Sequence, residues 1–164
     1  MRQRRPGLKH RLAGVVTLFL VAVACGAASA PDEADVTLAF ETLLEGAHSG
    51  LDEPLREVVR DGARWAALWG EIHSRVRPAP RLPTVDFSRH MVLVVGLGTR
   101  RSAGFQVEVR SVTLQGGRLL VAVHETCPDG GAVGMALTQP VHAVRVDRLA
   151  QDAAFRETRA ASCD

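Results

Sequence analysis

The chain has 164 residues, a length that suits a single domain. Its 20 basic and 18 acidic side chains give a net charge of +2, but five of the basic residues lie in the first eleven positions. Without residues 1–24 the chain keeps 15 basic and 18 acidic residues, a net charge of −3. A mildly acidic protein has no broad surface for phosphate groups, which argues against nucleic-acid binding.

Residues 1–24 have the pattern of a secretory signal peptide, because basic residues precede an apolar run that ends in small residues. The run is shorter than the roughly 20 apolar residues of a membrane-spanning helix. The sequence A-V-A-C at 22–25 resembles a lipobox. It predicts a lipid on Cys25 and a membrane-anchored lipoprotein of the cell envelope, facing the periplasm or the exterior. The alternative is ordinary cleavage at Ala28-Ser29-Ala30, in which Cys25 is discarded.

Residues 25–35 are small, acidic and proline-containing and predict a flexible tether, so residues 36–164 form the single domain. Alternating apolar residues and glycine-rich turns predict strands at 36–44, 55–60, 90–97, 105–114, 118–125, 141–147 and 154–158. We expect a turn over 46–54 between the first two strands. We also expect a hairpin between 90–97 and 105–114. These elements predict a β-dominated α+β fold, a mostly antiparallel sandwich or partly open barrel.

One helix is expected on this sheet, with Asp61 as its N-cap. The apolar residues after Asp61 recur at helical spacing, at Trp65, Leu68, Trp69 and Ile72. We expect this face to anchor the helix on the sheet. The alternative is that the two tryptophans stack on a ligand.

No catalytic motif is present: the chain has no nucleophile elbow, no H-E-x-x-H or C-x-x-C and no phosphate-binding loop. We therefore expect no enzyme activity, no catalytic residue and no cofactor. His124, Cys127 and His142 could form a zinc site, but their spacing is not that of a zinc motif. We expect both histidines to be half-exposed strand residues and no metal to be bound.

The three cysteines point to one disulfide. If Cys25 carries the lipid, Cys127 and Cys163 remain as a pair in an oxidising compartment. Their bond closes a loop of 36 residues and holds down the last strand. Chain entropy makes such a bond worth roughly 4 kcal/mol.

The expected hairpin loop at 98–104 is the candidate partner-binding site. Its proposed contact residues are Thr99, Arg100, Arg101, Ser102 and Phe105. Two arginines on an otherwise acidic protein suit an anionic partner, although a solvated turn is the alternative. The segments at 128–131 and 138–140 are expected at the same end of the fold. Three loops would then form one surface, as in immunoglobulin-like sandwiches.

These segments also resemble the PrcB-like C-terminal domain, a bacterial family named after an accessory subunit of a secreted protease complex. The resemblance covers roughly residues 55–147, and Ala103 and Phe105 replace its usual Gly and Tyr. It rests on V-V-R-D-G-A-R-W-A-A-L-W at 58–69, D-F-S at 86–88, M-V-L-V-V at 91–95, G-T-R-R-S-A-G-F-Q-V-E-V at 98–109, P-D-G-G at 128–131 and A-L-T-Q-P at 136–140.

Together, the amino terminus and this resemblance imply an exported, lipid-anchored binding module. It would associate with another envelope or secreted protein, such as a subtilisin-like protease, as an accessory subunit. One alternative is a loop-presenting protease inhibitor similar to chagasin, because T-R-R-S-A-G-F at 99–105 loosely resembles the N-P-T-T-G-Y loop of those inhibitors. Another is a purely structural envelope lipoprotein.

Overall fold

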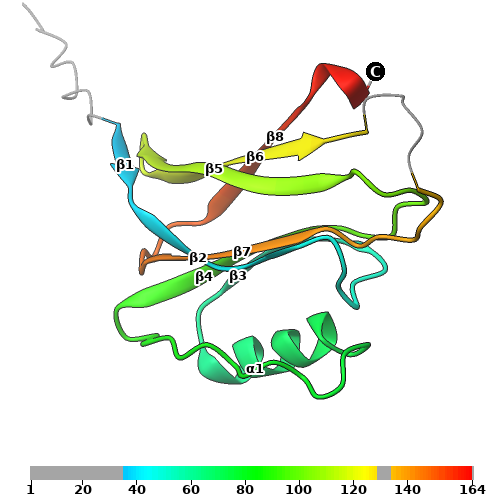
Figure 1. Ribbon diagram of the computed structural model, residues 1–164. Helices are drawn as coiled ribbons and strands as arrows, with labels where there is room; N and C mark the ends of the chain where they lie inside the picture. The colour runs from blue at the N-terminus through cyan, green and yellow to red at the C-terminus, as the bar shows by residue number, and fades with distance from the viewer. Residues whose placement is uncertain (1–34, 129–133, 164) are drawn as a thin grey trace, which may run out of the picture. The chain divides into compact units, whose positions relative to one another are not determined.

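Two four-stranded sheets face each other, and one helix covers the outer face of the second (Figure 1). The structure is a computed structural model that describes residues 35–128 and 134–163. The first sheet has the order β1-β5-β6-β8 and the second β2-β7-β4-β3. The predicted β-dominated sandwich is confirmed. Its elements are β1 Val36–Leu38, β2 Phe40–Gly46, β3 Pro54–Val59, α1 Gly62–Ile72, β4 His90–Leu97, β5 Gln106–Gln115, β6 Arg118–Thr126, β7 Val141–Asp147, β8 Ala153–Arg159 and a short 3-10 helix Ala161–Cys163.

The second sheet is the middle layer of the fold, which explains why β4 is almost continuously apolar and why β7 is buried along most of its length. Strands that are covered on both faces need apolar residues at every position. In β4, Met91, Leu93 and Val95 pack between the sheets. Val92 and Val94 point the other way and pack against the helix side.

The helix begins and packs as the sequence predicts. Asp61 is the N-cap, and its side chain accepts a hydrogen bond from the Arg64 N–H. The four predicted face residues are buried against the sheet. The indole N–H groups of Trp65 and Trp69 donate to the carbonyls of Pro83 and Pro80, so the connector after the helix wraps around both rings. The anchoring interpretation of the tryptophans is confirmed.

The first sheet covers the other side of the core with one face and exposes the other. In β5, Val107 and Val109 are buried while Gln106 and Glu108 are exposed. β5 and β6 form a hairpin through Gly116 and Gly117, whose φ values of 51° and 71° are those of a tight two-residue turn. β8 then pairs with β6 in parallel, and its Ala153 and Phe155 pack on the core.

The predicted hairpin between residues 90–97 and 105–114 is wrong. β4 pairs with β3 and β7 in one sheet, whereas β5 pairs with β1 and β6 in the other. The loop between β4 and β5 therefore crosses from one sheet to the other. The burial of β4 on both faces and of β5 on only one distinguishes the two strands.

One other predicted feature of the amino-terminal half is also wrong. Residues 36–44 form two strands, because the chain leaves the first sheet after Leu38 and enters the second at Phe40. The predicted connection over 46–54 is present between β2 and β3, which lie at opposite edges of their sheet. β2 pairs with β7, and β3 pairs with β4.

The predicted disulfide is present between Cys127 and Cys163, with Cα atoms 5.0 Å apart. It fastens the end of the chain beside β6, where the Ala160 N–H also donates to the Glu125 carbonyl at 2.9 Å. The predicted signal peptide at 1–24, lipidation site Cys25 and tether up to residue 34 lie outside the described residues. No helix of the described part is long and apolar enough to cross a membrane.

Candidate protein-binding site

Three connections meet at one end of the sandwich, the right-hand end of Figure 1, and we call their described residues 47–53, 98–105 and 134–140 the loop end. Arg100 and Thr138 exchange backbone hydrogen bonds of 2.7 and 3.0 Å. The Thr99 N–H donates to the Asp52 carbonyl, and the Gln139 N–H donates to that of Ala47. The expected convergence of the loops at 98–104 and 138–140 is confirmed, and the loops hold one another in place.

Pro128 also belongs to this end. A Cβ added at Gly104, whose φ is 94°, would lie 3.0 Å from the Pro128 Cβ. The remainder of the predicted loop at 128–131 lies outside the described residues. The close approach shows that the β4–β5 and β6–β7 connections pack together at Gly104.

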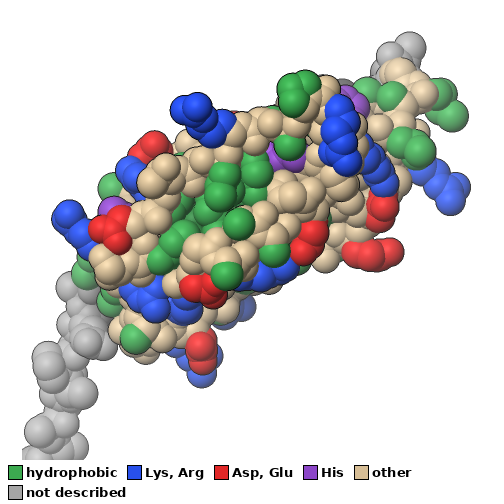
Figure 2. Space-filling model, turned by 90° about the horizontal axis from the view of Figure 1, so that it is seen from below, with side chains coloured by type: hydrophobic (Ala, Val, Ile, Leu, Met, Phe, Trp, Pro, Cys, Tyr) green, Lys and Arg blue, Asp and Glu red, His purple; other side chains and the backbone are tan. Residues whose placement is uncertain are grey.

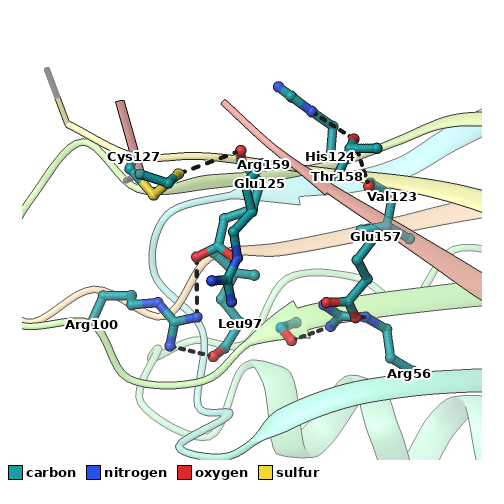
Figure 3. Close-up of polar contacts among 12 residues, drawn as sticks. Arg56, Leu97, Arg100, Val123, His124, Glu125, Cys127, Glu157, Thr158 and Arg159 are labelled. Atoms are coloured by element: carbon teal, nitrogen blue, oxygen red, sulfur yellow. Dashed lines mark hydrogen bonds and ion pairs between the residues drawn. A yellow bond between two sulfur atoms is a disulfide. The ribbon is translucent and has the colours of Figure 1, made fainter. Parts of the chain in front are cut away.

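Arg100 does not present its charge to the exterior. Its guanidinium donates to the Leu97 carbonyl at 2.8 Å and to Glu125 Oε1 at 3.3 Å. It also lies over the Phe105 ring, 5.6 Å from the centroid. Figure 3 shows it pointing inward to Glu125, which also pairs with Arg159 at 3.2 Å. Arg100 thus ties the loop end to the β6–β8 edge.

The other predicted contact residues divide into exposed and internal ones. Arg101 is exposed and carries the outward charge of this loop. The Ser102 carbonyl accepts a hydrogen bond from the Thr138 hydroxyl at 3.0 Å. The Thr99 hydroxyl donates to Asp52 at 3.0 Å. Phe105 packs on the core between the sheets, as expected for an anchor. Partner binding by these residues stays a prediction.

Asp52 is the acidic centre of the loop end. Arg75 donates to both of its carboxylate oxygens at 2.8 Å, and Thr99 donates to one of them. The hydrogen bond from Arg75, followed by that from Thr99, lowers the pKa of the Asp52 carboxyl. These contacts connect the β2–β3 loop to the segment that follows α1 and to the β4–β5 loop.

Two large apolar side chains at the loop end were not predicted as contact residues. Met135 is 93% exposed and Leu137 is 64% exposed. Leu137 borders a cavity of about 340 Å³ with Ile72 and Val76. Figure 2, viewed from the α1 side, shows hydrophobic side chains gathered on this face between charged ones. The sequence G-M-A-L-T at 134–138 could have indicated these contact residues, because exposed loops seldom place two large apolar residues so close together.

The predicted exposure of His142 is wrong, since the residue is only 2% exposed. Its Nδ1 accepts a hydrogen bond from the Val109 N–H at 2.9 Å, and its Nε2 lies 3.0 Å from the Thr42 hydroxyl. A backbone N–H can only donate, so Nδ1 carries no proton and Nε2 donates to Thr42. Burial lowers the pKa of His142, opposed in part by Glu45 and Glu108.

The zinc alternative finds no support in this geometry. The sulfur of Cys127 is bonded to that of Cys163, and both nitrogens of His142 face protein partners. His124 pairs with the Thr158 hydroxyl at 2.9 Å, as Figure 3 shows. Within residues 35–128 and 134–163 no group of three metal-ligating side chains is found.

Comparison with known proteins identifies one family. Residues 91–147 match the family model described as PrcB C-terminal. No curated protein and no solved structure matches the chain. The matched residues run from β4 to β7 and include two of the three connections of the loop end, whereas β3, α1 and β8 lie outside the match. Residues 91–147 of this chain are therefore a PrcB-like C-terminal domain.

Proposed function

We propose that this chain is an exported, lipid-anchored and non-catalytic binding module that serves as an accessory subunit of a protease complex. The family match supports association with a protease complex in general terms. The basic start, the short apolar run and the A-V-A-C sequence support export and a lipid on Cys25. The partner we propose is a secreted subtilisin-like protease.

The observation that carries this proposal is the loop end. Its backbone is fixed by hydrogen bonds between loops, so partner binding costs little ordering entropy. Exposed apolar side chains on a fixed surface are typical of protein interfaces, and methionine adapts to the shape of its partner. Met135 and Leu137 supply this apolar centre, and Arg101 adds a charge at the same end of the fold.

Photo-crosslinking in the native envelope tests the proposal. A photoreactive phenylalanine in place of Leu137 should crosslink the full chain to a protease. The matched control is the same group in place of Arg118, an exposed residue of the β5–β6 turn that lies at the other end of the sandwich. Crosslinking to no protease from Leu137, or equal yields from both positions, contradicts the proposal.

The isolated complex then separates an accessory subunit from an inhibitor. An accessory subunit leaves the protease able to cleave a peptide substrate, whereas a chagasin-like inhibitor abolishes cleavage. Mass spectrometry of the native protein tests the anchor. It should find residues 1–24 missing and a lipid on Cys25, and a mature chain that begins beyond Cys25 rules the anchor out.

A further inference from the structure

The outer edge of β5 is covered by a neighbouring strand along only part of its length. β5 spans Gln106–Gln115, but β1 pairs only with residues 112–114. After Leu38 the chain drops into the other sheet, as Figure 1 shows where β1 leads into β2. None of the described strands pairs with this side of β5 over residues 106–111. An uncovered strand edge is a template for another extended chain.

A hydrogen bond from Val109 fixes which backbone groups face this edge. The Val109 N–H donates to His142 and is therefore not hydrogen-bonded to the backbone of β6. Successive residues of a strand direct their N–H and C=O groups to alternate sides. The register with β6 is regular from Gln106 to Val109. Val107 therefore directs both its N–H and its C=O to the uncovered side.

This side of β5 opens into a cleft of about 280 Å³. Phe105, Gln106 and Val107 form one wall, and Glu45, Gly46 and Ala47 of the other sheet form the second. Gly46 contributes only backbone to this wall, because it is opposite Val141, which packs on the α1 side of the sheet.

The carboxylate of Glu45 lies on the cleft side of its sheet. Glu45 is opposite His142 in the β2–β7 pair. Opposite residues of two strands project from the same face, and His142 reaches β5 from that face. Glu45 also lines the cleft, which places an acidic group in it.

We propose that this cleft binds an extended segment of a partner protein that carries a lysine or arginine, added as a strand antiparallel to β5 in line with β1. The partner residue opposite Val107 exchanges two backbone hydrogen bonds with it and projects its side chain into the cleft. The aliphatic stem lies against Phe105 and Val107, and the charged end reaches Glu45. In such strand addition the backbone supplies affinity and the cleft supplies specificity.

Charge favours a basic partner segment over two other occupants. Residues 26–34 of this chain contain Asp32 and Glu33 but no basic residue, and Pro31 has no N–H to donate. A second copy of the chain would bring its own Glu45 to the same edge. Both occupants would place carboxylates against carboxylates.

The test uses the full chain in detergent and the peptide T-V-K-V-T, with a fluorescent label at its blocked amino end. Fluorescence anisotropy should show saturable binding with a Kd below about 1 mM. Methylating the backbone nitrogen of the lysine should abolish binding, because it removes the hydrogen bond to Val107. Replacing the lysine by glutamate should do the same. Equal binding of either control peptide overturns the proposal.

Variants of the chain locate the site. Glu45→Arg replaces the acidic group of the cleft by a positive charge and should weaken binding at least about tenfold. Glu53→Arg is the matched control, because Glu53 is exposed and does not line the cleft. Glu45→Gln should weaken binding a few-fold at low salt and reduce its salt dependence. The amide resonance of Val107 should shift when the peptide binds.

Unchanged binding by both Glu45→Arg and Glu45→Gln overturns the proposal. So does a parent chain that sediments as a dimer and becomes a monomer with Glu45→Arg, because a second copy is then the occupant. Thermal unfolding of each variant should match that of the parent. No protease is present in this experiment, so its failure leaves the proposed function untouched, and the reverse also holds.

Discussion

Protonation of His142 should destabilise the domain, because it breaks a bond between the two sheets. In the neutral ring Nδ1 accepts from Val109 and Nε2 donates to Thr42. In the imidazolium both nitrogens carry hydrogen, so Nδ1–H faces the Val109 N–H and two donors oppose each other. The charge would also lie in a site that is 2% exposed. Burial therefore lowers the pKa of His142 in the folded state.

Proton linkage gives the sign and the upper limit of the change in the free energy of unfolding with pH. An unfolded histidine titrates near pH 6.5, and the folded His142 titrates at lower pH. Between these values the unfolded state binds more protons, so the free energy of unfolding falls as the pH decreases. One proton limits the slope to about 1.4 kcal/mol per pH unit. The lowered pKa values of Asp52 and Asp86 make the free energy of unfolding depend on pH in a separate range, at and below about pH 3.8.

Urea titrations from about pH 7.5 to about pH 5 measure this slope across the histidine range. Trp65 and Trp69 report unfolding, since they are the two tryptophans of the chain and both are buried. His142→Asn keeps an acceptor near the position of Nδ1 and does not titrate, so its stability should vary less with pH. Equal pH dependence in the parent and in His142→Asn would refute the reasoning. His142→Leu leaves the Val109 N–H without its acceptor and should cost about 1–3 kcal/mol at neutral pH.

Three further predictions concern stability. Replacing Cys127 and Cys163 together by Ser should lower the free energy of unfolding by about 4 kcal/mol, because the bond closes a loop of 36 residues; a loss below about 1 kcal/mol in urea titrations contradicts it. Trp65→Ala removes a side chain that is 1% exposed and should cost about 3–5 kcal/mol, measured by circular dichroism; an unchanged melting curve would mean that the ring does not anchor the helix. Arg100→Ser should cost about 1–3 kcal/mol through its bonds to Leu97 and Glu125, whereas Arg101→Ser should stay within about 0.5 kcal/mol; equal melting temperatures for the two variants would contradict the inward position of Arg100.

Local patterns in the sequence predicted those parts of the fold that depend on neighbouring residues. The helical spacing of Trp65, Leu68, Trp69 and Ile72 identified the buried face, and two adjacent glycines identified the β5–β6 turn. Strand pairing is not local. The sequence places β4 immediately before β5, and only the apolar residues on both faces of β4 indicated that the two strands lie in different sheets.

The candidate site was predicted less completely than the fold. The position of the β4–β5 loop beside residues 138–140 was expected, but not that Arg100 turns inward to Glu125. The direction of an arginine depends on residues far along the chain, and Glu125 comes from another strand. His142 was missed for the same reason, because the N–H that donates to it belongs to Val109 in β5, a strand of the other sheet.

The distance along the chain between paired strands sets the order in which this protein can fold. Thr42 in β2 and His142 in β7 are 100 residues apart, and β2 has β7 as its neighbour in the sheet. Such contacts form slowly, since a long loop must close before any contact offsets its entropy. The second sheet lacks one of its two central strands until β7 is in place. The apolar strand β4 therefore stays without its β7 neighbour until late in folding, and the core forms in one late step.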